Sequence, residues 1–334
     1  MRVRAVTCWA IATVVGAACG GGGPATKQPL NGTRAGRGTT VGAAPDVRAA
    51  TTTWTPPTDA QIPHDSLGAS IRRGLALIDH THDSLPRFAP GNVNCTSCHI
   101  DAGRAMDAVP LTRAHARYPR YMERNGAIVT LADRVNYCIT RSLSGIPLPD
   151  DSREMKDILV YLAFISRGVP VGPTTVGVSG LSAMPDSIVG NATRGATVYQ
   201  TSCASCHGAN GEGNPSIAPG IPAVWGVRSY SIGASMAREE RAASFIWHNM
   251  PYGNPKSLTP QQAFDVSAYV NSQLRPDMPG KENDWPGGGA PKDVPYDTKS
   301  GHRAHAPPAK LAPRSNAADA IVRPAHSVRG TLAP

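Results

Sequence analysis

Two cysteine pairs, each followed directly by a histidine, have residue types and a spacing that point to a definite chemistry. The first motif consists of Cys95, Cys98 and His99, and the second of Cys203, Cys206 and His207. In a C-x-x-C-H motif the two thiols add to the vinyl groups of a haem, and the histidine binds the iron as its proximal ligand. The sequence therefore predicts two covalently bound haem c groups, with His99 and His207 on the two irons.

Cysteine pairs at this spacing also occur in zinc sites, in thioredoxin-like redox centres and in small disulfide loops. Each of these alternatives explains the pairs but leaves both histidines to coincidence. A thioredoxin-like pair is also expected near a strand–helix–strand pattern, and no such pattern flanks either motif. The repeated histidine therefore favours haem.

One further cysteine lies between the two motifs. Of the seven cysteines, Cys8 and Cys19 belong to the N-terminal region and four belong to the motifs, which leaves Cys138. A buried core cysteine is one interpretation. The other is a thiolate ligand of the first haem iron, its pKa lowered by ferric iron and by nearby arginines.

A methionine is the expected sixth ligand of the second haem. A haem that only carries electrons is usually bound by a methionine on a loop before the C-terminal helix. Met250 stands 19 residues before Tyr269 and is predicted to be this ligand. Met236 lies earlier, in an expected helix, and Met278 lies beyond the last expected helix. No methionine occupies the matching place in the first half of the sequence.

The elements that position these residues occur twice. His99 and Tyr161 are 62 residues apart, and His207 and Tyr269 are also 62 residues apart. Apolar residues at helical spacing precede and follow each motif. A haem motif between two amphipathic helices is the plan of a small cytochrome c domain. The sequence therefore predicts an all-α fold of two tandem cytochrome c domains.

The boundaries of these domains follow changes in composition. The first domain is expected at residues 61–168, and the second at 185–276. A linker occupies residues 169–184, a disordered tether 20–60, and a largely disordered tail rich in proline and glycine 277–334. Within that tail, residues 285–296 are a candidate for contact with the second domain.

The N-terminus has the pattern of an export signal. Arg2 and Arg4 precede an apolar run, and small residues then lead to Cys19. Residues 1–19 are therefore expected to be a signal peptide with a lipoprotein cleavage site, and plain cleavage nearby is the alternative. The mature protein is expected in the periplasm or cell envelope, with membrane attachment through lipidated Cys19.

The composition narrows the class of partners. The 334 residues include 33 Lys and Arg against 24 Asp and Glu, which gives a formal net charge of +9. No block of five or six like charges suggests a nucleic-acid partner. The spread positive charge instead indicates a mild preference for anionic partners or ligands.

A longer motif around Cys138 is more specific. It reads Arg134-Val-Asn-Tyr-Cys138-Ile-Thr-Arg141-Ser142-Leu-Ser-Gly145. Residues 94–103, 225–226, 233–236 and 249–251 add shorter matches. Over roughly residues 62 to 296, the sequence resembles the thiosulfate dehydrogenase family of dihaem cytochromes c.

This resemblance implies two haems with different roles. The first, bound by His99 and Cys138, would be the catalytic centre that joins two thiosulfate ions into tetrathionate. The second, bound by His207 and Met250, would pass the electrons to a periplasmic acceptor such as a small cytochrome c. In some family members a lysine precedes the methionine and exchanges with it. Here Asn249 stands at that position, so permanent methionine ligation is expected.

Such a reaction brings two dianions together and therefore needs a cationic pocket. Arg134 and Arg141 stand four residues before and three after Cys138, on or near one helical face. Arg104 is a third candidate, and Ser142 can hydrogen-bond a sulfonate oxygen. We expect Cys138, Arg134 and Ser142 to form the catalytic site. For each arginine, a haem propionate or solvent is the alternative partner.

Three other functions remain open for the sequence. A dihaem electron carrier without its own substrate needs no thiolate ligand, so Cys138 argues against it. The same scaffold could also act on a different sulfur substrate or reduce tetrathionate. The second option differs only in direction, which depends on potentials and supply. A membrane-bound electron-entry subunit is a further alternative, and its mark would be a stable partner complex.

Overall fold

The computed structural model of the chain describes residues 54–169, 181–185, 187–217, 220–304 and 310–311. The expected signal peptide, most of the tether and linker, and the end of the tail lie outside these residues. No helix within the described ranges has the length and apolar character needed to cross a membrane.

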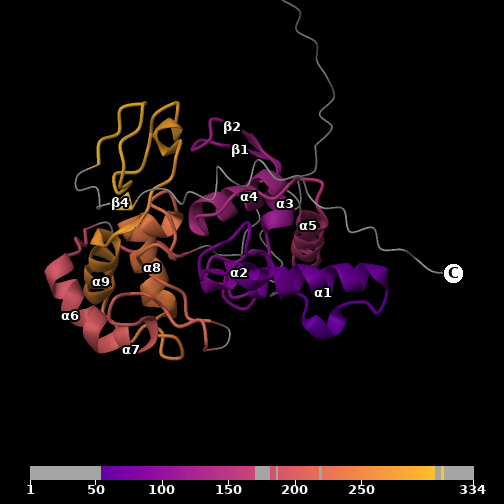
Figure 1. Ribbon diagram of the computed structural model, residues 1–334, viewed down its shortest axis with the longest axis horizontal. Helices are drawn as coiled ribbons and strands as arrows, with labels where there is room; N and C mark the ends of the chain where they lie inside the picture. The colour runs from indigo at the N-terminus through magenta and orange to yellow at the C-terminus, as the bar shows by residue number, and fades with distance from the viewer. Residues whose placement is uncertain (1–53, 170–180, 186, 218–219, 305–309, 312–334) are drawn as a thin grey trace, which may run out of the picture. The chain divides into compact units, whose positions relative to one another are not determined.

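Helices dominate the described part of the chain, and the strands are short (Figure 1). The first half contains α1 (Ser66–Asp79), α2 (Thr81–Ser84), α3 (Ala114–Arg117), α4 (Leu131–Ser142) and α5 (Arg153–Ile165). The second half contains α6 (Ala192–Ser202), α7 (Ala204–His207), α8 (Glu239–Asn249) and α9 (Pro260–Ser272). The strands are β1 (Arg120–Met122), β2 (Ala127–Val129), β3 (Arg275–Pro276) and β4 (Lys310–Leu311), with β1 antiparallel to β2 and β3 parallel to β4.

Helices α1 and α5 cross closely and form the frame of the first domain. Asp65 caps the start of α1, where its side chain accepts a hydrogen bond from the Gly68 amide. At the crossing, a Cβ atom on Gly74 would lie 2.1 Å from the carbonyl oxygen of Asp157 and 2.7 Å from the Cβ of Tyr161. Only a glycine at position 74 permits this approach.

The same crossing recurs in the second domain between α6 and α9. A Cβ on Gly195 would lie 1.9 Å from the carbonyl oxygen of Asp265 and 2.9 Å from the Cβ of Tyr269. The glycine, aspartate and tyrosine thus take matching places in both halves. The internal repeat predicted from the sequence is present in three dimensions.

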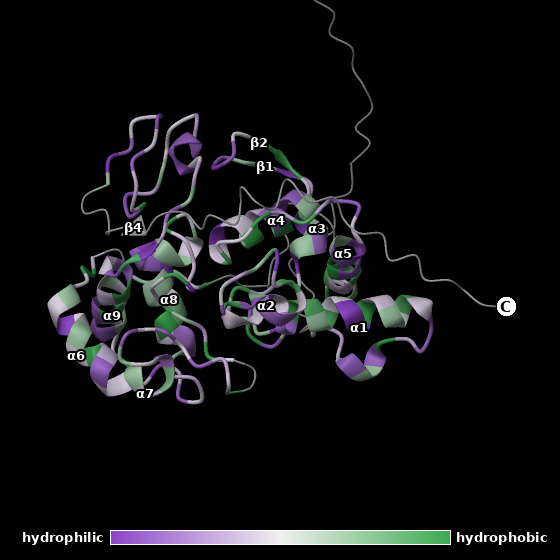
Figure 2. Ribbon diagram, in the orientation of Figure 1, coloured by the Kyte–Doolittle hydropathy of each residue, from purple (hydrophilic) through white to green (hydrophobic). Residues whose placement is uncertain are grey.

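Apolar side chains on these helices build the core of the first domain. Figure 2 shows both apolar and polar residues along α1, as expected of a helix with one buried face. The buried members from α1 and α5 include Ile71, Ile78, Met155, Ile158, Tyr161, Leu162 and Ile165. They share this core with Val93, two residues before the first haem motif, and Cys95 packs against it, so the helices and the motif are held together.

A buried aspartate ties the two helices of each crossing together. Asp157 on α5 accepts hydrogen bonds from Arg73 (Nε–Oδ2 2.6 Å) and Ser70 (2.5 Å) on α1. In the second domain, Asp265 on α9 accepts two hydrogen bonds of 2.7 Å from Arg194 on α6. Each pair joins the first helix of a domain to its last helix.

We expect the Asp157 pair to make folding stability depend on acid pH. Burial by itself raises the pKa of Asp157, but the hydrogen bonds and charge of Arg73 outweigh burial, so the pKa lies below its usual value. Because the unfolded chain then binds the proton more readily, this stabilisation is present above the unfolded pKa of about 3.9 and is lost as the pH falls through the folded pKa.

Urea unfolding of the haem-loaded protein between pH 7 and pH 2.5 measures this dependence. Asp157→Asn should be less stable than the wild type at pH 7, and the difference should shrink as the pH falls below 4. Asp151→Asn, which alters an exposed carboxylate just before α5, is the matched control and should follow the wild type. A constant difference for Asp157→Asn across the range would contradict the prediction.

The segment after the second domain differs from the expected disorder as far as residue 304. Trp285, Val294 and Tyr296 are buried in one cluster with Ile232. The backbone amide of Trp285 also donates a 2.9 Å hydrogen bond to the carbonyl of Arg124 in the first domain. This burial agrees with the contact with the second domain for which residues 285–296 are a candidate. For the rest of the described segment the composition is misleading, because a few large side chains anchor a stretch that is otherwise rich in proline and glycine. The segment packs against both domains.

Candidate functional site

A cavity of about 220 Å³ lies between the first haem motif and α4. It brings together most of the residues predicted for the first haem and its substrate: Cys95, Cys98, His99, Arg134, Cys138 and Ser142. The remaining lining is largely aliphatic and includes Ile78, Leu85, Val93, Leu131, Ile158 and Leu162. An apolar cavity with two thiols and a histidine on one wall suits a covalently attached porphyrin.

Helix α4 forms the second wall of the cavity along its whole length. Thr130 caps this helix and exchanges hydrogen bonds with Asp133, which fixes where the helix begins. Arg134, Cys138 and Ser142 then follow at intervals of four residues, so they share one face. That face lines the cavity, as the spacing in the sequence predicts.

Both motif histidines are oriented to bind a metal through Nε2. The Nδ1 of His99 lies 2.5 Å from the carbonyl oxygen of Val109, and the Nδ1 of His207 lies 3.0 Å from that of Pro222. A carbonyl can only accept, so Nδ1 carries the proton in each ring and Nε2 keeps its lone pair. This is the tautomer that a proximal iron ligand needs.

Cys138 differs from the motif cysteines in its acidity. Burial by itself raises the pKa of the Cys138 thiol, but the charge of Arg134 and its hydrogen bond to the sulfur, with the nearby His99 ring, outweigh burial and lower the pKa to about 7. The Nη1 of Arg134 lies 2.9 Å from the sulfur. Burial raises the pKa of Cys95 and Cys98 to about 12. Cys138 is therefore set up to be a thiolate near neutral pH.

Two arginines that the sequence analysis did not single out also line the cavity. Arg113 and Arg117 are one helical turn apart, at the start and the end of α3. Burial, and then the positive charge of Arg117, lower the pKa of Arg113. Their spacing of four residues was visible in the sequence, but α3 has only four residues and no apolar period to reveal it. With Arg134, they make the cavity cationic.

The other two candidate arginines have different positions from those expected. Arg104 donates a hydrogen bond to the Pro57 carbonyl (3.0 Å) and pairs with Asp59 (2.5 Å). Arg141 points away from the cavity and forms two hydrogen bonds to Asp284, of 2.8 and 2.5 Å. Neither residue lines the cavity. Each arginine is instead bound to groups outside it, Arg104 to Pro57 and Asp59 and Arg141 to Asp284.

Asp284 is the centre of a buried cluster of charges. Besides Arg141, it accepts hydrogen bonds from Arg124 (3.0 Å) and from the hydroxyl of Tyr296 (2.6 Å). Arg141 and Asp284 are only 5% and 4% exposed. The guanidinium of Arg141 also stacks on Tyr137, 4.1 Å from the ring centre. Two arginines of the first domain therefore share one carboxylate from the segment that follows the second domain.

The second motif lies at the junction of α6 and α7. Cys203 ends α6, and Cys206 and His207 lie on α7. Next to the motif, Tyr199 packs against Trp225 with ring centres 4.7 Å apart. Arg275, at the end of the domain, is fully buried, and within the described residues its Nε and Nη1 have no hydrogen-bond partner. A buried cation with free donors fits a carboxylate supplied by a bound group, such as a haem propionate.

Met250 directly follows α8, at the position predicted for it on a loop before the last helix. Its amide closes the helix with a 2.8 Å hydrogen bond to the carbonyl of Ile246. The side-chain amide of its neighbour, Asn249, donates 3.0 Å hydrogen bonds to the carbonyls of Asp107 and Phe245. Asn249 is thus held by contacts to both domains.

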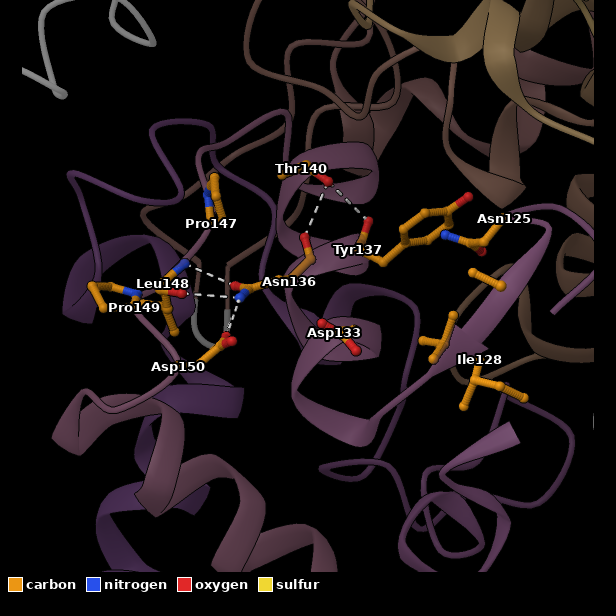
Figure 3. A pocket seen from close by; sticks show the side chains of 12 residues that line it. Asn125, Ile128, Asp133, Asn136, Tyr137, Thr140, Pro147, Leu148, Pro149 and Asp150 are labelled. Carbon is orange, nitrogen blue, oxygen red and sulfur yellow. Dashed lines mark hydrogen bonds between the residues drawn. The ribbon is translucent and has the colours of Figure 1, made fainter. Parts of the chain in front are cut away.

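A wider, open hollow of about 720 Å³ lies on the other side of α4 (Figure 3). Asn136 holds its edge, because its side chain exchanges hydrogen bonds of 2.9 and 2.8 Å with the backbone of Leu148 and reaches Asp150 at 3.1 Å. None of the predicted site residues lines this hollow. The contacts of Asn136 with Leu148 and Asp150 fix the loop that joins α4 to α5.

Comparison with known proteins agrees with this arrangement. Residues 87–171 match the family described as SoxA/TsdA, cytochrome c domain, and residues 192–273 match the family described as cytochrome c. The prediction of two tandem cytochrome c domains is confirmed. Two such domains carry two covalently bound haem c groups, as the motifs predict.

Relatives that align with both domains extend the match. The chain is 39% identical over 240 residues to a thiosulfate dehydrogenase of Psychrobacter arcticus, covering 71% of this chain and 73% of the relative. It is 37% identical over 237 residues to a thiosulfate dehydrogenase of Allochromatium vinosum, covering 68% and 86%. The solved thiosulfate dehydrogenase TsdBA from Marichromatium purpuratum superposes with a TM-score of 0.64 at 34% identity, and the match covers 68% of this chain and half of that one. The chain belongs to the thiosulfate dehydrogenase family of dihaem c-type cytochromes.

Proposed function

We propose that this protein oxidises thiosulfate to tetrathionate at its first haem and passes the electrons through its second haem to a periplasmic acceptor. The observation that supports this most directly is a cysteine of lowered pKa that faces His99 in a cationic cavity. A pure electron carrier has no need of such a thiol. Export to the periplasm, with a lipid on Cys19, is part of the same proposal.

The ligands of both irons belong to this proposal. Cys95 and Cys98 would attach the first haem, and His99 and Cys138 would be the ligands of its iron. Cys203 and Cys206 attach the second haem, with His207 and Met250 as the ligands of its iron. Each haem, when bound, accepts one electron. The first domain, residues 61–168, provides the reaction site, and the second, residues 185–276, provides the exit for electrons.

The reaction balances with Cys138 as the nucleophile. The Cys138 thiolate forms a disulfide bond with the sulfane sulfur of one thiosulfate, which releases two electrons, and the two haems would take up one electron each. A second thiosulfate then attacks that sulfur, tetrathionate forms, and the Cys138 thiolate is released. Arg134, next to the sulfur, keeps the thiol ionised and attracts the anions. Ser142, one turn further along α4, can donate a hydrogen bond to a sulfonate oxygen.

The test is thiosulfate-dependent reduction of ferricyanide by the haem-loaded protein. We expect turnover that depends on thiosulfate, and about a 10²-fold lower kcat/KM for Arg134→Gln. Arg104→Gln removes an equal charge whose partners lie outside the cavity, so it should retain wild-type kinetics. Absence of thiosulfate-dependent reduction in protein that carries both haems would instead support the electron-carrier function.

Arg141 should affect stability and not substrate binding. Arg141→Met leaves Asp284 with fewer partners in a buried site, and we expect a loss of about 3 kcal/mol in the free energy of unfolding. The KM for thiosulfate should stay within about twofold, because the side chain does not line the cavity. Asp284→Asn, which strips the same cluster from the other side, should lower stability in the same way. A large rise in KM for Arg141→Met alone would place this arginine in the substrate site.

A further inference from the structure

Asn92, in the first domain, reaches into the haem-binding loop of the second domain. It lies three residues before Cys95 and is 3% exposed. Its Oδ1 accepts a 2.9 Å hydrogen bond from the amide of Ala223, and its Nδ2 donates a 3.2 Å hydrogen bond to the carbonyl of Glu212. Both side-chain atoms are therefore used to hold the loop that follows the second haem motif.

The Ala223 amide belongs to the same peptide group as the Pro222 carbonyl. That carbonyl is the acceptor of the 3.0 Å hydrogen bond from the Nδ1 of His207. A peptide group that donates at its nitrogen becomes a better acceptor at its oxygen, because the two hydrogen bonds polarise it in the same direction. Asn92, the peptide group and His207 thus form one continuous chain of hydrogen bonds.

The first haem motif has no equivalent of this chain of hydrogen bonds. The Nδ1 of His99 also donates to a backbone carbonyl, that of Val109. The next residue is Pro110, whose nitrogen carries no proton and cannot donate. The carbonyl that orients His99 is therefore not polarised in this way, and the difference between the two domains is built into the sequence.

We propose that Asn92, although it belongs to the first domain, is a positioning residue for the second haem and lowers the reduction potential of that haem. By accepting from the Ala223 amide, it strengthens the hydrogen bond that His207 donates to Pro222. A more strongly bonded Nδ1–H makes the imidazole a better electron donor at Nε2, which stabilises ferric iron over ferrous iron. The inference rests on His207 as the proximal ligand and does not depend on thiosulfate as the substrate.

The experiment is a spectroelectrochemical titration of the dihaem protein, with the two haems followed separately by their absorption. Asn92→Leu keeps the size of the side chain and removes the acceptor. We expect the reduction equilibrium of the second haem to shift about threefold towards the ferrous form, which is roughly a 30 mV rise at 59 mV per tenfold change. The first haem should keep its potential. If Asn92→Leu does not accumulate, Asn92→Ala is titrated in its place with the same expectation.

The direction of the shift separates this role from a merely structural one. A loosened domain interface admits water, which favours the more highly charged ferric state and lowers the potential. Ser144→Gly provides the control, because it removes a 3.0 Å hydrogen bond to the Ser229 carbonyl in the other domain without touching the Pro222 peptide. The φ of Ser144 is +50°, so glycine is accepted there without strain.

A rise in the Asn92 variant, with no rise in Ser144→Gly, supports the proposal. A fall, an unchanged second haem, or an equal shift of both haems overturns it. None of these outcomes depends on turnover, so a protein that proved inactive with thiosulfate would still answer the question.

Discussion

Cys138→Ala should lower kcat/KM for thiosulfate by about 10³-fold or more while both haems stay attached. The substitution removes the proposed nucleophile and iron ligand together, and losses of this size are typical when a covalent catalyst is deleted. The Arg134 guanidinium, 2.9 Å from the sulfur, would then face an empty position. Steady-state kinetics, mass spectrometry for two haem additions, and the absorption spectrum of the first haem together measure the effect.

Thr140→Ala is the matched control for this variant. Thr140 lies on the same helix two residues later, but it lines the open hollow on the other side of α4. Its hydroxyl donates to backbone carbonyls of the same helix, at 3.0 Å to Asn136 and 3.3 Å to Tyr137. We expect wild-type kinetics. Near-normal turnover by Cys138→Ala, with an unchanged first haem spectrum, would show that Cys138 is a structural cysteine.

Gly74→Ala should destabilise the first domain severely. The added methyl group would lie 2.1 Å from the carbonyl oxygen of Asp157, a backbone atom that cannot move without separating α1 from α5. We expect a loss of about 3–5 kcal/mol in the free energy of unfolding, more than is typical of overpacking, because the clash is with a backbone atom. Denaturant unfolding of the haem-loaded protein, followed by far-UV circular dichroism, measures this loss.

Gly287→Ala tests the specificity of that effect. A Cβ on Gly287 would meet no atom within 4 Å, and its backbone is not in the left-handed region. This variant should unfold like the wild type or be slightly more stable. If Gly74→Ala were tolerated equally well, the close contact between α1 and α5 would be wrong.

The sequence revealed those parts of the site that depend on local spacing. Arg134, Cys138 and Ser142 share a face because a helix repeats every 3.6 residues, and the structure has that helix at Leu131–Ser142. The motif cysteines and histidines were recognisable because each set stands at fixed positions within five consecutive residues. The matching glycines, Gly74 and Gly195, follow from the repeat of the whole domain.

Contacts between distant residues were not predictable in the same way. Arg141 has the spacing of a substrate ligand, but its partner, Asp284, lies 143 residues away in a segment whose composition suggested disorder. Arg113 and Arg117 lie in a helix too short to show a period. Helical spacing tells which side chains share a face, but long-range packing decides what that face meets.

The buried cluster around Asp284 also bears on how the protein is made. The ribosome completes Arg124 and Arg141 well before Asp284 emerges, so the newly made first domain has two guanidiniums without their carboxylate. The first domain reaches its final stability only after the second domain and the segment beyond it have been synthesised. A gene fragment that encodes the first domain alone should therefore give a short-lived protein in the cell, even if that protein carries its haem.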